Sequence, residues 1–89
     1  MLMMSKDRPY PLTAATDGEQ VKIAHVNGGS RLTKRLFNMG LFEGVEVDVI
    51  MRQTGGAVVM RCHGARLALG VGMAHKIQVT RIQEEQDDE

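Results

Sequence analysis

The residue pair with the clearest capacity for chemistry is Cys62 and His63, a thiol beside an imidazole. Thiolate sulfur and imidazole nitrogen are both ligands that transition metals accept in proteins. On a regular strand adjacent side chains point to opposite faces, so these two converge only if a turn distorts the strand at His63. The other histidines, His25 and His75, are far away in sequence, and none of the three has a second ligand at a strong metal-binding spacing. We therefore expect no resident cofactor, and a transition-metal site at Cys62 and His63 is the alternative to a buried thiol beside a turn histidine.

Motifs for catalysis and nucleotide binding are missing from the sequence. No glycine-rich loop is followed by Lys-Ser or Lys-Thr, so we expect the chain not to bind GTP by itself. The stretch 70–73 lacks the third glycine of a dinucleotide-binding fingerprint. The acidic residues of the body fall on a strand face or in turns, without a cleft-like grouping. We therefore expect that the protein is not an enzyme.

Basic side chains form a second group with binding potential. Arg31, Lys34 and Arg35 fall in one predicted helix, and Phe42 follows in the next turn. An apolar group beside charged ones suits a small protein interface, so these four are the candidate partner-binding residues. Together with arginines farther along the chain, the same cations suit a nucleic-acid-binding barrel as a third alternative. Aromatic side chains that stack bases are nearly absent, however, and an acidic tail competes with phosphate, so we expect no nucleic-acid partner.

The helix that carries these cations is predicted from Ser30 to Met39. Leu32, Leu36 and Met39 recur at i, i+4 and i+7 and share one apolar face, opposite the first two cations. Ser30 is placed to serve as the N-cap. A helix of roughly ten residues is marginal alone in water, so its apolar face must pack on the rest of the chain.

The end of this helix is predicted at Gly40. A residue without Cβ takes the left-handed C′ position at no steric cost, and Leu41 then becomes C″ and folds back on Leu36. The sequence therefore predicts a Schellman motif here.

The rest of the chain has the pattern of short strands. Apolar alternation predicts them at about residues 20–26, 45–52, 57–62, 66–69 and 77–82. His63 and Gly64 are placed in the centre of a tight turn, and residues 70–74 are irregular or form a single helical turn. Met39, Met51, Met60 and Met73 occupy apolar positions and are expected in the core. About five short antiparallel strands with one short α-helix after the first strand favour a mainly β fold, a small SH3-like barrel, because an open sheet leaves exposed edges.

Length and charge indicate one domain. In a chain of 89 residues we expect a flexible lead-in at residues 1–11, the barrel at residues 12–82 and an acidic disordered tail at residues 83–89. The net charge is 0, but residues 1–83 carry eleven basic and six acidic side chains, and the tail carries the other five acids. A single cysteine, the lack of a secretory signal and the lack of a transmembrane stretch indicate a cytoplasmic protein without direct membrane insertion.

An ordered set of glycines and core aliphatics runs through almost all of this body. It consists of Gly28-Gly29, Arg35-Leu36, Met39-Gly40-Leu41, Gly44 with the valines after it, Arg66-Leu67-Ala68-Leu69, Ala74, Ile77 and Val79. From about Pro11 to Ile82 this set resembles the FeoA family of ferrous iron transport accessory proteins. The sequence departs from that family at Glu43, where proline is frequent, and at residues 70–72, which are looser than the usual helical turn.

The resemblance implies a small SH3-like cytoplasmic protein that supports or regulates ferrous iron uptake. Its implied partner is FeoB, the GTPase-containing membrane permease, contacted at its cytoplasmic G domain or inner membrane face. The same fold family includes the C-terminal domain of diphtheria-toxin-repressor-like metalloregulators, so a metal-binding or metal-sensing domain is the alternative function. A weak homo-oligomer stays open.

Overall fold

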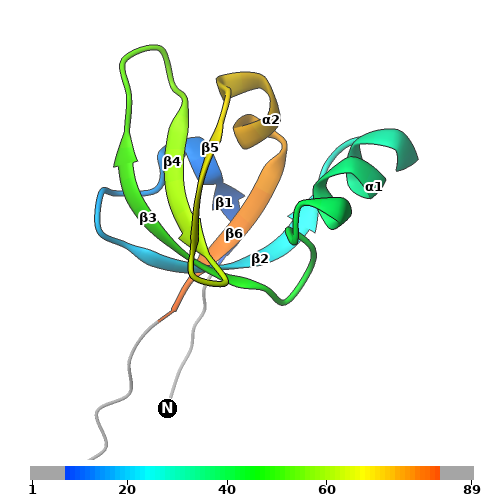
Figure 1. The fold of residues 1–89 in the computed structure, drawn as a ribbon, viewed down its shortest axis with the longest axis horizontal. Coiled ribbons are helices and arrows are strands. Elements are labelled where there is room, and N and C mark those ends of the chain that lie inside the picture. The colour runs from blue at the N-terminus through cyan, green and yellow to red at the C-terminus, as the bar shows by residue number, and fades with distance from the viewer. Residues whose placement is uncertain (1–7, 83–89) are drawn as a thin grey trace, which may run out of the picture.

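One sheet of antiparallel strands forms most of the molecule, with the strand order β1-β6-β2-β3-β4-β5 (Figure 1). The computed structural model describes residues 8–82. The strands are β1 (Tyr10–Pro11), β2 (Gln20–Val26), β3 (Glu46–Arg52), β4 (Val58–Cys62), β5 (Ala65–Leu69) and β6 (Ile77–Arg81). The helices are the 3-10 helix η1 (Leu12–Ala14), α1 (Ser30–Asn38) and α2 (Val71–His75). The mainly β architecture, with a short α-helix after the first long strand, is confirmed.

The sheet has six strands where the sequence predicted five, because β1 pairs with β6. Tyr10 lies opposite Val79, and Pro11 lies opposite Gln78. A two-residue strand is too short to show alternation, so the sequence placed it inside the lead-in of residues 1–11. Tyr10 is half-buried and packs against the core. Residues 1–7 of that lead-in and the tail of residues 83–89 lie outside the described residues.

The core lies inside the bend of the sheet and consists of aliphatic side chains with one thiol. Its buried members are Leu12, Ala15, Val21, Ile23, Leu36, Leu41, Val45, Val47, Val49, Val58, Met60, Cys62, Leu69, Ala74, Ile77 and Val79. Met51 was expected among them, but its side chain is 44% exposed, so that prediction was wrong. The register of β3 against β4 shifts between Val49 and Met51, and this bulge breaks the alternation that should have turned Met51 inward.

Helix α1 begins one residue earlier than predicted. The N-cap is Gly29, with extended dihedrals of φ −74° and ψ 177°, and its carbonyl accepts the N–H of Thr33 at 3.1 Å. Ser30 is therefore already helical, and its assignment as the cap was wrong. The chain reaches the helix through Gly28, where a Cβ would lie 2.5 Å from Leu32 Cδ2. A side chain at position 28 would push Leu32 away from the core.

The predicted Schellman motif at the end of α1 is confirmed. Gly40 has φ +88°, its N–H bonds to the carbonyl of Phe37 at 2.9 Å, and the N–H of Leu41 bonds to the carbonyl of Leu36 at 2.8 Å. The tight turn at His63 and Gly64 is also confirmed, because both have positive φ and β4 and β5 pair directly on either side.

Gly40→Ala is expected to lower the free energy of unfolding by about 1–2 kcal/mol, since an L-residue is strained in the left-handed region. The added Cβ would also lie 3.2 Å from the ring carbon Cδ2 of His63. Urea unfolding measures the change. Gly72→Ala is the control, because Gly72 is helical with no atom near its Cβ position, and alanine there should stabilise the domain slightly. Equal effects of the two substitutions would contradict this account of the motif.

A partly buried carboxylate, that of Glu19, ties β1 to β6. The side chain of Glu19 is only 9% exposed, and its Oε2 accepts the Tyr10 hydroxyl at 2.6 Å and Arg81 Nε at 2.9 Å. Its Oε1 accepts the backbone N–H of Thr16 at 2.7 Å. Burial alone would raise the pKa of Glu19, but these hydrogen bonds outweigh it and hold the pKa below its ordinary value. Burial and the bond to Glu19 raise the pKa of Tyr10 to about 12.

The domain should lose stability in acid through Glu19. Because the pKa of Glu19 is lower in the folded than in the unfolded chain, its contribution is complete above the ordinary pKa and is lost as the pH falls through the folded-state pKa. Glu19→Gln should cost about 1–3 kcal/mol at pH 7, as expected for hydrogen bonds to a charged group. Urea unfolding at pH 7 and pH 3 should show the gap between the two proteins shrinking in acid. A gap that stays constant or widens would contradict this assignment.

Candidate partner-binding surface

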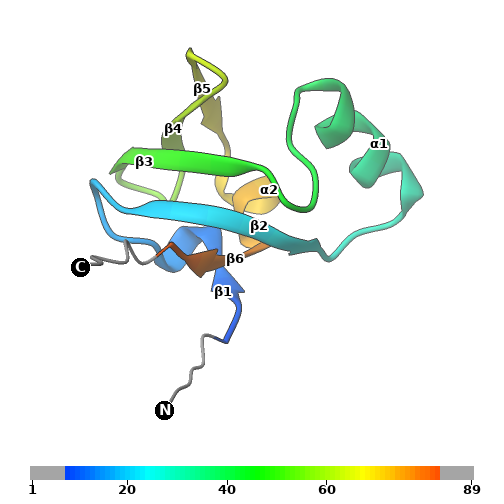
Figure 2. The same ribbon diagram turned by 90° about the horizontal axis from the view of Figure 1, so that it is seen from below.

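Helix α1 stands beside the sheet and is joined to it at the end of β2 and the start of β3 (Figures 1 and 2). Leu36 anchors it with a side chain that is fully buried, and Leu32 and Met39 pack half-buried against the core. These are the three residues that the sequence assigned to the apolar face. The opposite face of the helix is left to solvent.

Exposed cations lie on that face and at its edge, where Arg35 follows Lys34. Arg31, Lys34 and Arg35 are all exposed, and none of them forms an ion pair with any residue between 8 and 82. Arg35 lies in the last turn, where a positive charge interacts favourably with the helix dipole. The three predicted basic residues therefore lie on one accessible element with their charge available to a partner.

An aromatic pair lies at the C-terminal end of the same helix. The rings of Phe37 and Phe42 have their centroids 4.9 Å apart, with a tilt of 41° between their planes. The two residues are 56% and 39% exposed, so the pair lies at the surface rather than in the core. Exposed apolar side chains that support one another are typical anchors of protein interfaces.

A cavity of about 470 Å³ opens next to this pair. It is lined by His25, Val26, Gly28, Thr33, Phe42 and Glu43, which come from the end of β2, the loop after it, α1 and the turn before β3. His25 Nδ1 lies 3.6 Å from Glu43 Oε2 at the rim. The volume of the cavity suits a bulky side chain of a partner, with Phe42 as an apolar wall and polar groups at the edge.

The sequence identified Phe42 but missed Phe37 and the cavity. Phe37 lies off the stripe of Leu32 and Leu36, and a large aromatic residue at a polar helix position is a signal that sequence reading could have used. The cavity has no comparable signal, because its lining residues belong to separate segments that only the tertiary fold brings together.

Cys62 and His63 both lie against Gly40 at the end of α1. The Cys62 thiol is buried and points to the carbonyl oxygen of Gly40 at 3.8 Å, and burial raises the pKa of the thiol. His63 is exposed, and its ring lies next to Gly40, with Cδ2 at 3.2 Å from the position that a Cβ on Gly40 would take. Within residues 8–82 no group of three or more His, Cys, Asp or Glu side chains is placed to hold a metal ion. The two candidate ligands thus both neighbour Gly40, one buried and one exposed, and residues 8–82 supply no third ligand beside them.

No helix of the described residues is long and apolar enough to cross a membrane. The longest of them, α1, has nine residues.

A family model and a relative in sequence agree on the family of this chain. Residues 10–81 match the family model described as the FeoA domain. A protein of Methanocaldococcus jannaschii that bears the name Fe(2+) transport protein A is 37% identical over 70 residues, covering 79% of this chain and 84% of that protein.

Solved structures share the fold. An iron uptake regulatory protein (FeoA) has a TM-score of 0.77 at 25% identity, covering 84% of this chain and 100% of the other. A manganese-dependent transcriptional repressor also has a TM-score of 0.77, at 18% identity, covering 90% of this chain and 45% of its own. These overlaps confirm the SH3-like fold expected from the sequence.

Proposed function

The chain belongs to the FeoA family of ferrous iron transport accessory proteins, and we propose that it acts in the cytoplasm, without enzymatic activity, by binding the permease FeoB through α1. The binding face, called here the α1 surface, consists of Arg31, Lys34, Arg35, Phe37 and Phe42 with the adjoining cavity. Of the candidates that the sequence offered, all four partner-binding residues belong to it.

The observation that carries this proposal is the exposed aromatic pair, next to a cavity, on an element that also carries three exposed cations. An isolated exposed phenylalanine needs no explanation, but here two are in contact, and one of them, Phe42, lines a cavity of about 470 Å³. The cations Arg31, Lys34 and Arg35 have no ion-pair partner in the described part of the chain. An interface with an apolar centre and a charged rim has this composition.

The surface defines the chemistry of its partner. The matching face of FeoB carries an apolar side chain that enters the cavity and acidic side chains opposite the three cations. The cytoplasmic G domain or the inner membrane face of FeoB is the proposed location of that face. Family membership and the name of the archaeal relative support a role in ferrous iron transport.

The double variant Arg31→Glu with Lys34→Glu tests the charged part of the surface. Reversing two rim charges should weaken binding to the cytoplasmic domains of FeoB about tenfold or more and should slow association most at low salt. Both residues are exposed, so the urea midpoint should change little. Biolayer interferometry at two salt concentrations measures affinity and association rate.

The charge-matched control is Arg8→Glu with Lys22→Glu. Both residues are exposed and lie outside α1, so the same change in net charge occurs on another part of the molecule. The control should retain most of the affinity. Equal losses in the two double variants would indicate general charge attraction, and unchanged affinity of the α1 variant would move the binding face elsewhere.

A further inference from the structure

The two edges of the sheet differ in how they are protected. The edge strand β1 has two residues, one of them Pro11, which has no N–H to offer a new strand. The other edge strand, β5, has five residues, contains no proline and pairs with β4 in an unbroken register. A regular edge of this length is a template on which another strand can pair.

The hairpin turn determines which backbone groups of β5 are free. With only His63 and Gly64 in the turn, Cys62 and Ala65 form the first hydrogen-bonded pair of the hairpin. Hydrogen-bonded pairs alternate in an antiparallel ladder, so Ala65, Leu67 and Leu69 bond to β4. The N–H and C=O groups of Arg66 and Ala68 therefore point away from the sheet, and both residues are exposed.

At this edge of the sheet two positive charges stand next to each other without a negative charge opposite them in the described strands. One row of cross-strand neighbours runs from Gln20 to Asp48, Arg61 and Arg66. Gln20 Nε2 donates to Asp48 Oδ1 at 2.9 Å, whereas neither arginine forms an ion pair with any residue that the structure describes. Like charges directly opposite one another are destabilising, and the sequence has no acidic residue between Asp48 and Glu84. Within residues 8–82 no strand pairs with the outer side of β5, so the row ends at Arg66.

We propose that the free edge of β5 binds an extended acidic segment of a partner protein as an added strand. The segment bonds to the backbone of Arg66 and Ala68 and places a carboxylate beside the Arg66 guanidinium. A second copy of β5 fits poorly, because antiparallel pairing of two such edges brings arginines together. The chain's own acidic stretch, residues 84–89, contains only Glu, Gln and Asp and no β-branched or aromatic residue, so it is a poor strand former.

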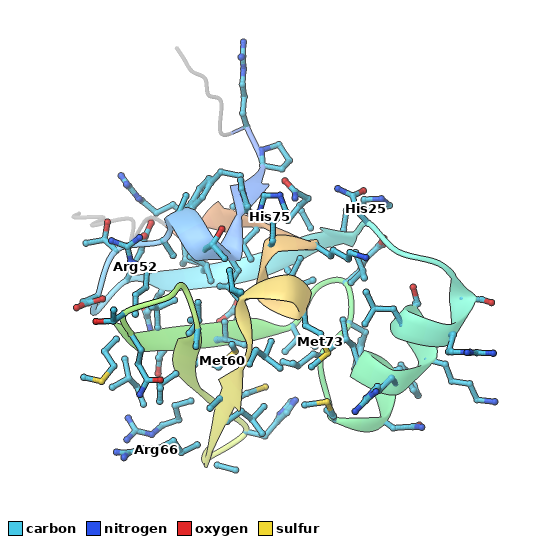
Figure 3. The ribbon with its side chains drawn as sticks, turned by 90° about the horizontal axis from the view of Figure 1, so that it is seen from above. His25, Arg52, Met60, Arg66, Met73 and His75 are labelled. Carbon is cyan, nitrogen blue, oxygen red and sulfur yellow. The ribbon has the colours of Figure 1, made fainter. Side chains whose placement is uncertain are left out.

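This edge is separate from the α1 surface, so the proposal stands whether or not that surface binds FeoB. Figure 3 shows Arg66 on the β5 hairpin and His25, which lines the cavity, on opposite sides of the molecule, and the hairpin touches the end of α1 at its turn, where His63 lies against Gly40. A single partner could therefore use one site while the other remains open.

The test is an NMR titration of the full chain, labelled with ¹⁵N, with a capped seven-residue peptide of alternating valine and glutamate. The amides of Arg66 and Ala68 should shift and exchange more slowly with solvent. A peptide with lysine in place of glutamate should bind about tenfold more weakly. A glutamate peptide that is N-methylated at every amide has no N–H to offer along either edge, so it separates strand pairing from charge attraction, and it should not bind.

The matched variant is Arg66→Glu, which removes the like-charge pair with Arg61 and so should leave the fold intact. It should reverse the preference, binding the lysine peptide better than the glutamate peptide. The proposal is overturned if the glutamate peptide leaves Arg66 and Ala68 unshifted, or if the N-methylated peptide binds as well as the parent. A single-stranded DNA oligomer that shifts these amides at lower concentration than the peptide would also overturn it.

Discussion

Leu36→Ala should lower the free energy of unfolding by about 2–5 kcal/mol, the range measured for large-to-small changes in close-packed cores. Leu36 is fully buried, and it is the buried side chain of α1. Its carbonyl also accepts the Leu41 N–H that closes the end of the helix. Because small domains have only about 5–15 kcal/mol of total stability, this one substitution should be evident in urea unfolding at 25 °C.

The matched control is Leu32→Ala, which shortens the same type of side chain one turn earlier on the same face. Leu32 is only half-buried, so its loss should cost clearly less than the loss of Leu36. If Leu36→Ala folds under the assay conditions, it should also bind FeoB more weakly, since it loosens the helix that carries the α1 surface. An unfolding midpoint equal to that of the wild type would contradict the role of Leu36 as the anchor.

Phe37→Ala combined with Phe42→Ala should weaken binding to FeoB about a hundredfold, because aromatic anchors at the centre of an interface carry most of its energy. Each single substitution should cost part of this effect, and the two should be non-additive because the rings are in contact, with centroids 4.9 Å apart. Stability should change little, since both side chains are at least 39% exposed. Isothermal titration calorimetry and urea unfolding on the same samples separate affinity from stability.

Met51→Ala is the control for removal of exposed apolar area. Met51 is 44% exposed, comparable with Phe42, but it lies on β3 and lines no part of the cavity. Binding to FeoB should survive this change. Loss of affinity in the control, or full affinity in the double phenylalanine variant, would exclude the aromatic pair as the centre of the interface.

The parts of the fold predicted correctly from sequence are those governed by local rules. Gly40 followed by Leu41 gives the Schellman motif because only glycine takes the left-handed position freely. The adjacent His63 and Gly64 give the hairpin turn for a related reason. The alternation of Val45, Val47 and Val49 predicts a strand with one buried face, and the structure buries all three.

The parts that sequence reading missed depend on contacts between distant segments. Strand β1 forms because Tyr10 pairs with Val79 and its hydroxyl donates to Glu19. Both partners are too far along the chain for a local sequence pattern to indicate them. The bulge that exposes Met51 comes from the pairing of β3 with β4. The N-cap of α1 is Gly29 and not the predicted Ser30, because glycine also serves as an N-cap and the backbone at Gly29 is extended.

For the same reason the cations of the candidate site could be predicted from the sequence, and its cavity could not. Charges on a helix follow from spacing, so Arg31, Lys34 and Arg35 could be placed on α1 in advance. The cavity needs the end of β2, the start of α1 and the turn at Phe42 and Glu43 to meet, which only the tertiary structure provides.

The central claim is that this chain binds FeoB, and capture of the protein by the cytoplasmic domains of its own FeoB tests it most directly. The immobilised domains would be loaded with GDP, with a non-hydrolysable GTP analogue, or left empty. We predict saturable capture that differs between nucleotide states and is lost in the double phenylalanine variant. No capture in any nucleotide state would contradict the claim.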